Sequence, residues 1–219
     1  MNERAPSPWR TALTAAAVLG FFAVLGSALV GVAYQGTAER IAQSEREALL
    51  RQLNAILARH EYDNDLLNDY LDVSAPKRLG AETTRVYRAR RQGKPVALIL
   101  SPVVAQGYSG AIDLIVGIRV DGTLAGVRVL SHKETPGLGD RIDERKSPWI
   151  LGFSGKSLDE PPLSRWRVKR DGGDFDQFTG ATITPRAVVA AVKEALLWYR
   201  AQGPKLFEVP PQVEKTRHE

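Results

Sequence analysis

The sequence predicts an α+β protein with a single N-terminal transmembrane helix, followed by an antiparallel sheet with covering helices. Three observations indicate this class. Residues 11–34 carry no charge, residues 84–131 alternate between apolar and polar positions with short turns between the runs, and residues 186–202 are apolar at helical spacing. The chain has 219 residues, of which 43% are hydrophobic, so it can bury one sizeable core besides a membrane segment.

The composition excludes several kinds of chemistry. The chain has no cysteine, which removes disulfides, thiolate nucleophiles, cysteine-ligated zinc and iron–sulfur clusters. If this protein moves electrons, the carrier must therefore be organic. The net charge of +5 comes from 30 basic and 25 acidic residues in mixed order, without a basic run interleaved with aromatic residues. Such a pattern does not favour a nucleic-acid partner.

The N-terminal region is predicted to be a membrane anchor. Residues 1–10 form a short basic tail, and the uncharged run at 11–34 exceeds the roughly 20 apolar residues that cross a bilayer. The alternative is a cleaved signal peptide. Its hydrophobic core would be roughly 7–15 residues, and no convincing small-x-small cleavage site follows this run. Basic residues lie on both sides of the run, so their distribution does not fix the orientation.

Residues 35–80 are predicted to form a helical stalk. Residues 38–59 have one apolar face and one charged face, and residues 62–71 are acidic with apolar residues spaced for a short helix. The acidic segment raises the possibility of a calcium site, but it lacks the glycine and the terminal glutamate of a calcium loop. A solvated helix face is the favoured interpretation of its four aspartates, Asp63, Asp65, Asp69 and Asp72.

The folded domain is predicted to span residues 81–202. Four strands are expected in an antiparallel sheet, at residues 84–90, 95–101, 111–120 and 123–131. The last two are joined by Asp121-Gly122, a pair favoured in tight hairpins. The first pair is typical of a half-exposed edge, while the apolar run from Ile112 to Ile118 is typical of a central strand. The helix beginning at Pro185 would cover one face.

Two glycine-rich loops flank the second hairpin. Gln106-Gly107-Tyr108-Ser109-Gly110 precedes it, and residues 132–140 follow it. Because the start and the end of an antiparallel hairpin lie at the same edge, the two loops should meet there. Tyr108 and Leu138 would then be available to contact a ligand. Ordinary turns are the alternative for each loop. His132 is not a predicted ligand, because no second histidine lies at metal-ligand spacing from it.

The last motif precedes the final helix, with Thr184 as its predicted N-cap and Pro185 as its first helical residue. Free backbone N–H groups and the helix dipole favour an anion at such a position. Gly180 and Ala181 leave room for the anion, and Thr182 offers a hydroxyl. The alternative is a polar turn before an ordinary capped surface helix.

Asp176-x-x-Thr179-Gly180-Ala181-Thr182 resembles in full the D-x-x-[ST]-G-A-[ST] motif of the FMN-binding domain family, in which a flavin transferase esterifies the last hydroxyl with FMN phosphate. Together with the membrane span, Gly-Tyr-Ser-Gly and Glu-Thr-Pro-Gly-Leu-Gly, it makes the chain resemble the G subunits of the Rnf electron-transport complex. The chain is similar, less closely, to the C subunits of the sodium-translocating NADH:quinone oxidoreductase.

The resemblance implies a membrane-tethered flavoprotein whose FMN, joined to Thr182 by a phosphoester, relays electrons among other subunits of an ion-translocating NADH/ferredoxin oxidoreductase complex. It implies maturation by a flavin transferase. It also implies a bacterial inner membrane location with the soluble domain on the periplasmic side. Thr179, Gly180 and Ala181 would shape the loop, and Tyr108 and Leu138 would contact the flavin ring. Asp176 would serve recognition by the transferase or fix the turn, and Thr184 would cap the helix. Residues 203–219 would be a polar tail.

Three alternatives differ in class. The nearest is the C-type subunit of a sodium-translocating quinone reductase. The second is a non-redox, membrane-anchored binding or scaffold domain that uses the loop edge for a phosphate-bearing ligand or a partner protein. A self-contained hydrolase is disfavoured, because the chain has no cysteine, no G-x-S-x-G elbow and no histidine near an evident serine nucleophile. No catalytic residue and no metal ligand is predicted.

Overall fold

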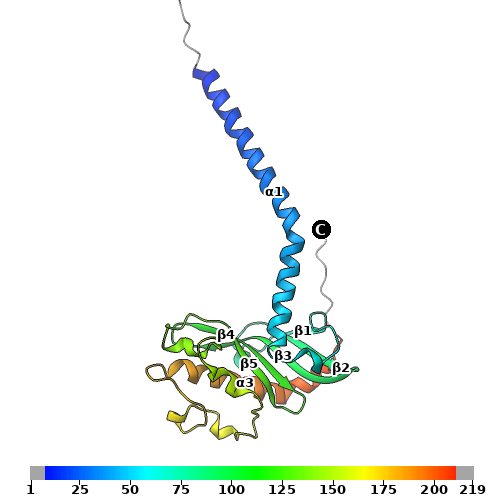
Figure 1. The fold of residues 1–219 in the computed structure, drawn as a ribbon, viewed down its shortest axis with the longest axis vertical. Helices are drawn as coiled ribbons and strands as arrows, with labels where there is room; N and C mark the ends of the chain where they lie inside the picture. The colour runs from blue at the N-terminus through cyan, green and yellow to red at the C-terminus, as the bar shows by residue number, and fades with distance from the viewer. Residues whose placement is uncertain (1–7, 211–219) are drawn as a thin grey trace, which may run out of the picture. The chain divides into compact units, whose positions relative to one another are not determined.

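The structure is a computed structural model that describes residues 8–210 (Figure 1). The described residues divide into two units, 8–49 and 50–210. The helices and strands in chain order are α1 (Pro8–Asn54), β1 (Tyr70–Val73), α2 (Pro76–Leu79), β2 (Thr84–Arg91), β3 (Lys94–Gln106), β4 (Ala111–Arg119), β5 (Leu124–Ser131) and α3 (Ile183–Gln202). Four short 3-10 helices lie in the segment between β5 and α3.

The first unit consists of helix α1 up to residue 49. Within it, Ala12–Val32 is a 21-residue stretch with a mean hydropathy of 2.3, long and apolar enough to cross a membrane. Its large apolar side chains are exposed, Leu19 and Phe22 among them. An apolar helix surface without protein cover is what a lipid environment requires. The helix predicted over residues 11–34 is therefore present.

The second unit is built on a five-stranded antiparallel sheet with the order β1-β2-β3-β4-β5. Strands β2 to β5 match the four predicted strands. Strand β3 runs further than predicted, to Gln106, with an irregularity in its pairing with β4 between Leu100 and Val103. Pro102 lies at that irregularity, where a residue without an N–H costs the ladder least.

The helix predicted at residues 62–71 is wrong. Tyr70 begins strand β1, which pairs with β2 in the register Tyr70 to Tyr87, and the residues before it form turns. Strand β2 otherwise presents unpaired backbone groups, and pairing them outweighs the weak helical spacing of a short segment. The expectation of a half-exposed edge at β2 fails for the same reason: β1 covers it, and Arg88 on β2 is fully buried.

Both faces of the sheet are covered. Helix α3 packs on one face through a core that includes Val192 and Leu196. On the other face, Ile56 lies over Gly117, where a Cβ would overlap its side chain. Gly117 therefore makes room for Ile56, whereas a Cβ at its strand partner Gly126 on β5 would lie 3.6 Å from the Ile56 carbonyl oxygen, an ordinary contact. Residues 50–57 therefore belong to the compact unit, and not to the helical stalk predicted over residues 35–80.

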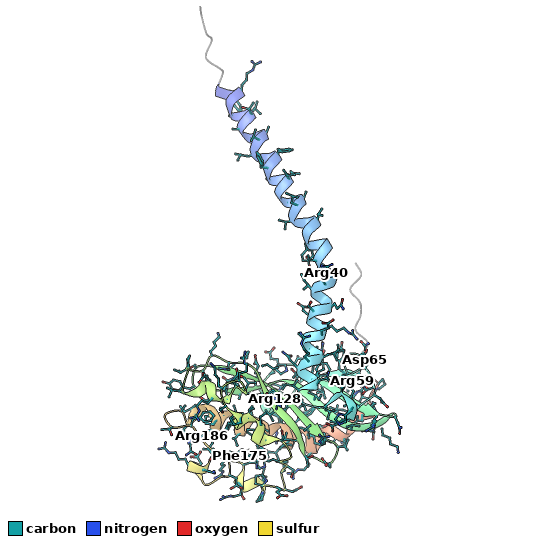
Figure 2. The ribbon with its side chains drawn as sticks, viewed as in Figure 1. Arg40, Arg59, Asp65, Arg128, Phe175 and Arg186 are labelled. Carbon is teal, nitrogen blue, oxygen red and sulfur yellow. The ribbon has the colours of Figure 1, made fainter. Side chains whose placement is uncertain are left out.

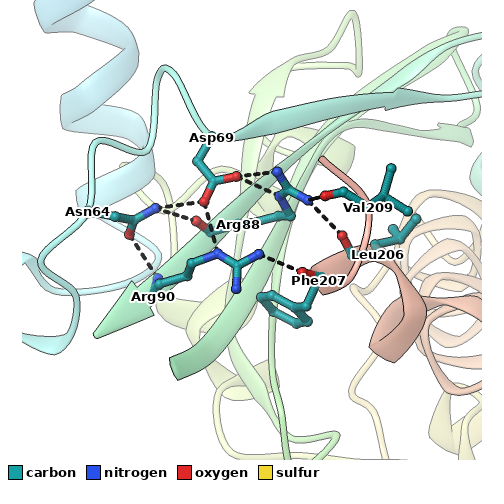
Figure 3. A network of polar contacts seen from close by, with 7 residues as sticks. All are labelled: Asn64, Asp69, Arg88, Arg90, Leu206, Phe207 and Val209. Atoms are coloured by element: carbon teal, nitrogen blue, oxygen red, sulfur yellow. Dashed lines mark hydrogen bonds and ion pairs between the residues drawn. The ribbon is translucent and has the colours of Figure 1, made fainter. Parts of the chain in front are cut away.

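The segment after α3 is also part of the folded unit, which corrects its assignment to a polar tail. Residues Gly203–Phe207 form a short 3-10 helix. The backbone carbonyls of Leu206 and Phe207 accept hydrogen bonds of 2.8 and 2.7 Å from Arg88 and Arg90 (Figure 3). The rest of the predicted tail, residues 211–219, lies outside the described residues.

The aspartates of the acidic segment serve the fold. Asp69 forms ion pairs with Arg88 at 2.5 Å and Arg90 at 3.0 Å, and Asp72 pairs with Arg85 at 3.0 Å. Arginines thus neutralise two of the four carboxylates, and the predicted solvated helix face does not exist. Within residues 8–210, no group of three or more histidine, aspartate or glutamate side chains is placed to hold a metal ion.

Candidate functional site

Three chain segments meet around a cavity of about 230 Å³ at one edge of the sheet. They are the loop after β3, the loop after β5 and the motif before α3. The residues that line the cavity are Tyr108, Glu134, Thr135, Leu138, Gly139, Gly180, Ala181, Thr182, Ile183 and Thr184. The prediction that the two glycine-rich loops meet is therefore confirmed, and the motif lies with them.

Thr182 is the N-cap of helix α3, and its side chain makes no capping hydrogen bond. It is half-buried and lines the cavity. No acidic residue stands in the first turn of α3. The free N–H groups of that turn and the positive end of the helix dipole therefore lie beside a hydroxyl that the helix does not use.

The predicted capping role of Thr184 is wrong. Helix α3 begins at Ile183, two residues before the predicted start at Pro185, and the buried Thr184 hydroxyl donates a hydrogen bond to Glu134. Pro185 then stands within the first turn, where it is tolerated because its missing N–H would have no partner inside the helix. Thr184 therefore ties α3 to the loop after β5.

The motif forms a β-turn over residues 178–181. The Ala181 N–H donates to the Phe178 carbonyl at 3.0 Å, and Gly180, the third residue of the turn, has φ of +81°. A positive φ at this place favours glycine. Thr179 is exposed at the tip of the turn and does not line the cavity, unlike the predicted site residues Gly180, Ala181 and Thr182.

The turn packs on a cluster of aromatic side chains. Phe178 is buried against Trp149 in an edge-to-face contact with ring centroids 5.3 Å apart. The Trp149 indole N–H donates to the Asp176 carbonyl at 2.9 Å. The cluster continues through Phe153 to Phe175, which is labelled in Figure 2 and stacks on Phe153 at 4.9 Å. The turn that presents Thr182 is thus anchored in a rigid part of the core.

The rim of the cavity carries exposed apolar side chains. Tyr108 is 72% exposed, Leu138 42% and Ile183 46%. Tyr108 and Leu138 were predicted to lie together and do line the same cavity. Ile183 was missed, because in the sequence it reads only as part of the helix. Three exposed apolar side chains around one cavity indicate a surface that a flat, partly apolar ligand covers.

Glu134 was not predicted as a site residue, although it belongs to the Glu-Thr-Pro-Gly-Leu-Gly segment. It is buried in the wall of the cavity and accepts a hydrogen bond of 2.9 Å from the Ser109 N–H. His132, which is not a predicted ligand, accepts a hydrogen bond from the Glu134 N–H at its Nδ1 atom, 3.1 Å away. The histidine therefore shapes the loop.

The loop after β5 ends at an ion pair that predicts a pH dependence of stability. A hydrogen bond from Arg145 lowers the pKa of Asp143 to about 2, from an ordinary value of 3.8. Because the folded pKa is depressed, the stabilisation is complete above pH 3.8 and is lost as the pH falls through about 2.

We expect Arg145→Gln to lower the urea midpoint slightly at neutral pH and to leave it unchanged near pH 2. The effect is small because Arg145 is exposed. Lys146→Gln removes the same charge from the neighbouring residue and serves as the control. Urea unfolding of the full chain in detergent, followed from pH 2 to 7, measures both variants. Equal midpoints for the two variants across this range would contradict the assignment of the Asp143 pKa to Arg145.

Comparison with known families agrees with this site. A family model described as the FMN-binding domain matches residues 107–197, which include both loops and the motif. A second model, the RnfG N-terminal region, matches residues 1–56. The fold and the site therefore define a membrane-anchored flavoprotein with an FMN-binding domain.

Curated relatives identify the family. The G subunit of the ion-translocating oxidoreductase complex of Pseudomonas aeruginosa is 50% identical over 199 residues, which is 90% of this chain and 93% of the relative. Its counterpart in Pseudoalteromonas atlantica is 47% identical over 191 residues, 87% of this chain and 89% of the relative. The chain belongs to the family of G subunits of ion-translocating oxidoreductase complexes, and is thus a flavoprotein component of such a complex.

Among solved structures, the C subunit of the Na(+)-translocating NADH-quinone reductase from Parabacteroides distasonis is similar to this chain. The match covers 67% of this chain and 69% of that chain, with 22% sequence identity and a TM-score of 0.42.

The residues around the cavity fit an FMN group. Tyr108, Leu138 and Ile183 provide an apolar surface for a flavin ring, and Thr182 provides a hydroxyl at the N-terminus of a helix that can stabilise phosphate. The cavity, at about 230 Å³, is below the roughly 300–1,000 Å³ of pockets that enclose whole ligands. Such a site would hold FMN partly exposed.

Proposed function

We propose that Thr182 carries FMN through a phosphoester bond and that the protein relays electrons among the other subunits of its complex. The observation that carries this proposal is the Thr182 hydroxyl itself. It lines the cavity, it is not used to cap α3, and it stands beside the free N–H groups of the first helical turn. The resemblance of residues 176–182 to the flavin-attachment motif supports the same residue.

The attachment requires an activated flavin donor, in which the FMN phosphate is joined by a diphosphate bond to a leaving nucleotide. The Thr182 oxygen forms a bond to the FMN phosphorus, and the diphosphate P–O bond breaks. The nucleotide leaves as a monophosphate with the electron pair, and the threonine proton passes to a base or to solvent. No atom changes its oxidation state. A flavin transferase supplies the donor and the base.

Covalent attachment suits this site because the cavity is small and open. Ordinary binding energy from three rim side chains would retain a partly exposed cofactor weakly, whereas a phosphoester retains it in full. When bound, FMN supplies one- and two-electron transfer, and the protein supplies binding and orientation. Exposure of the flavin lets partner subunits approach it closely.

We infer further that the protein sits in a bacterial inner membrane with its flavin domain on the periplasmic side. The resemblance to Rnf G subunits supports this orientation, and the lack of cysteine is compatible with it. Attachment of a cysteine-reactive, membrane-impermeant reagent to a Ser109→Cys variant in intact cells tests it. Labelling without lysis is expected, and labelling only after lysis would contradict the orientation.

The intact mass of the full chain, extracted from membranes with and without a co-expressed flavin transferase, tests the attachment. We expect a flavin-sized increase only with the transferase. Peptide mapping under visible absorbance should place it in residues 174–186. A chain without the adduct in the presence of the transferase would overturn the proposal and would favour a non-redox binding domain.

A further inference from the structure

One wall of the cavity contains a buried carboxylate, Glu134, to which the proposed function assigns no role. It is 5% exposed. One of its oxygens accepts a hydrogen bond of 2.9 Å from the Ser109 N–H, and the other accepts one from the Thr184 hydroxyl. A buried carboxylate is retained at low cost only when its oxygens are hydrogen-bonded, and here both are.

Two glycines make room for this carboxylate. A Cβ at Gly139 would lie 2.6 Å from one Glu134 oxygen and 2.8 Å from the Thr184 hydroxyl. A Cβ at Gly107 would overlap the other Glu134 oxygen. Both glycine-rich loops therefore approach the carboxylate so closely that a larger residue would displace it. This close approach is a physical reason for glycine at both positions.

Each segment that lines the cavity contacts Glu134 through a residue that lies one or two positions from a cavity-lining side chain. Tyr108 precedes Ser109, Leu138 precedes Gly139, and Thr182 lies two residues before Thr184. The segments that Glu134 joins lie 25 and 50 residues away from it in the chain. One carboxylate therefore connects the loop after β3, the loop after β5 and the first turn of α3.

We propose that Glu134 is a positioning residue for the flavin: it fixes the spacing between the Tyr108 and Leu138 side of the cavity and the attachment residue Thr182. This inference rests on the proposed function of the cavity. Glu134 acts through the backbone of Ser109 and through the hydroxyl of Thr184, not by contact with the reacting atoms.

Conservative variants separate geometry from charge. In Glu134→Gln, the amide oxygen can accept from the Ser109 N–H while the amide nitrogen donates to the Thr184 hydroxyl, which can also act as an acceptor. The geometry survives and the charge is lost. Glu134→Ala loses both hydrogen bonds. Thr184→Val keeps the volume and removes one bond. Thr123→Val is its control, because it makes the same change in the turn between β4 and β5, outside the residues that line the cavity.

The first measurement uses the full chain made without the transferase, so that no flavin is needed. Amide hydrogen exchange of the peptide that contains Ser109 is followed by mass spectrometry. We expect exchange at Ser109 to be about tenfold faster or more in Glu134→Ala, since a hydrogen bond to a charged group is lost. Exchange in Glu134→Gln and Thr123→Val should equal that of the wild type.

The second measurement uses the flavinylated chain and the quenching of its flavin fluorescence by iodide. We expect the quenching constant to rise in Glu134→Ala and to rise less in Thr184→Val, because the ring loses its fixed wall. The quenching constant should stay at the wild-type value in Glu134→Gln and Thr123→Val. If Glu134→Ala does not fold, Thr184→Val and its control still provide the comparison.

Two results would overturn the inference while leaving the proposed function intact. Faster exchange at Ser109 without any change in quenching would make Glu134 a structural residue only. Equal quenching in Glu134→Gln and Glu134→Ala, both above the wild type, would assign the effect to charge and not to position. Failure of the proposed function is recognised separately, as a wild-type chain that carries no flavin after co-expression with the transferase.

Discussion

Thr182→Ala is expected to abolish covalent flavin incorporation completely. The attachment needs an oxygen nucleophile at this position, and alanine has none. The fold should be nearly unchanged, because the Thr182 side chain makes no capping hydrogen bond to α3. Loss of flavin would therefore report the missing hydroxyl and not an unfolded domain. In-gel flavin fluorescence of the full chain, co-expressed with the transferase, measures the effect.

Two further variants control this experiment. Thr182→Ser keeps the hydroxyl and should retain part of the flavin. Thr179→Ala removes the other threonine hydroxyl of the motif, which is exposed and does not line the cavity, and should remain fluorescent. A Thr182→Ala band as bright as the wild type would rule out the attachment residue. Loss of fluorescence in Thr179→Ala, with retention in Thr182→Ala, would move the attachment to Thr179.

Local patterns predicted the sheet and the last helix well. Strands β2 to β5 alternate or form short apolar runs between glycine-containing turns, and α3 has helical spacing up to its end at Gln202. Strand β1 could not be predicted in this way. Its four residues carry a weak local signal, and only the unpaired edge of β2 makes them a strand. The packing of Ile56 on Gly117 likewise depends on residues far apart in the chain.

The site was predictable to the extent that hairpin geometry determines it. The start of β4 and the end of β5 lie at the same edge, which brings Tyr108 and Leu138 together. Glu134 was missed because a glutamate beside Lys133 resembles a solvated surface residue. Its burial results from the approach of Gly107 and Gly139, which no local pattern reveals.

The second large effect, a loss of folding stability, is expected when Asp69 is substituted. Asp69 holds the segment after α3 in place indirectly, through Arg88 and Arg90. Arg88, fully buried, pairs with Asp69 and donates hydrogen bonds to the carbonyls of Leu206 and Val209 (Figure 3). Arg90 pairs with the other Asp69 oxygen at 3.0 Å. Asp69 is the one carboxylate drawn in this network, so it compensates two guanidinium groups.

Asp69→Asn is therefore expected to lower the free energy of unfolding by about 3–5 kcal/mol, because it keeps the shape of the side chain but leaves the buried Arg88 without its counter-charge. Arg88→Met should lower the free energy of unfolding by less than Asp69→Asn does, since Asp69 would still pair with Arg90. Asp72→Asn is the matched control on the same strand pair. Its partner Arg85 is 38% exposed, and the cost should be within about 1 kcal/mol.

Urea unfolding of the three full-length variants in detergent measures this order of destabilisation. The comparison requires that the unfolding free energy depend on urea concentration with the same slope in each variant. Limited proteolysis after α3 should accelerate in both variants, because Asp69→Asn loosens the Arg88 guanidinium that binds the carbonyls of residues 206 and 209, and Arg88→Met removes it. A cost for Asp69→Asn no larger than that for Asp72→Asn would contradict the reasoning. It would mean that the carbonyl dipoles of the C-terminal segment alone compensate the buried arginine.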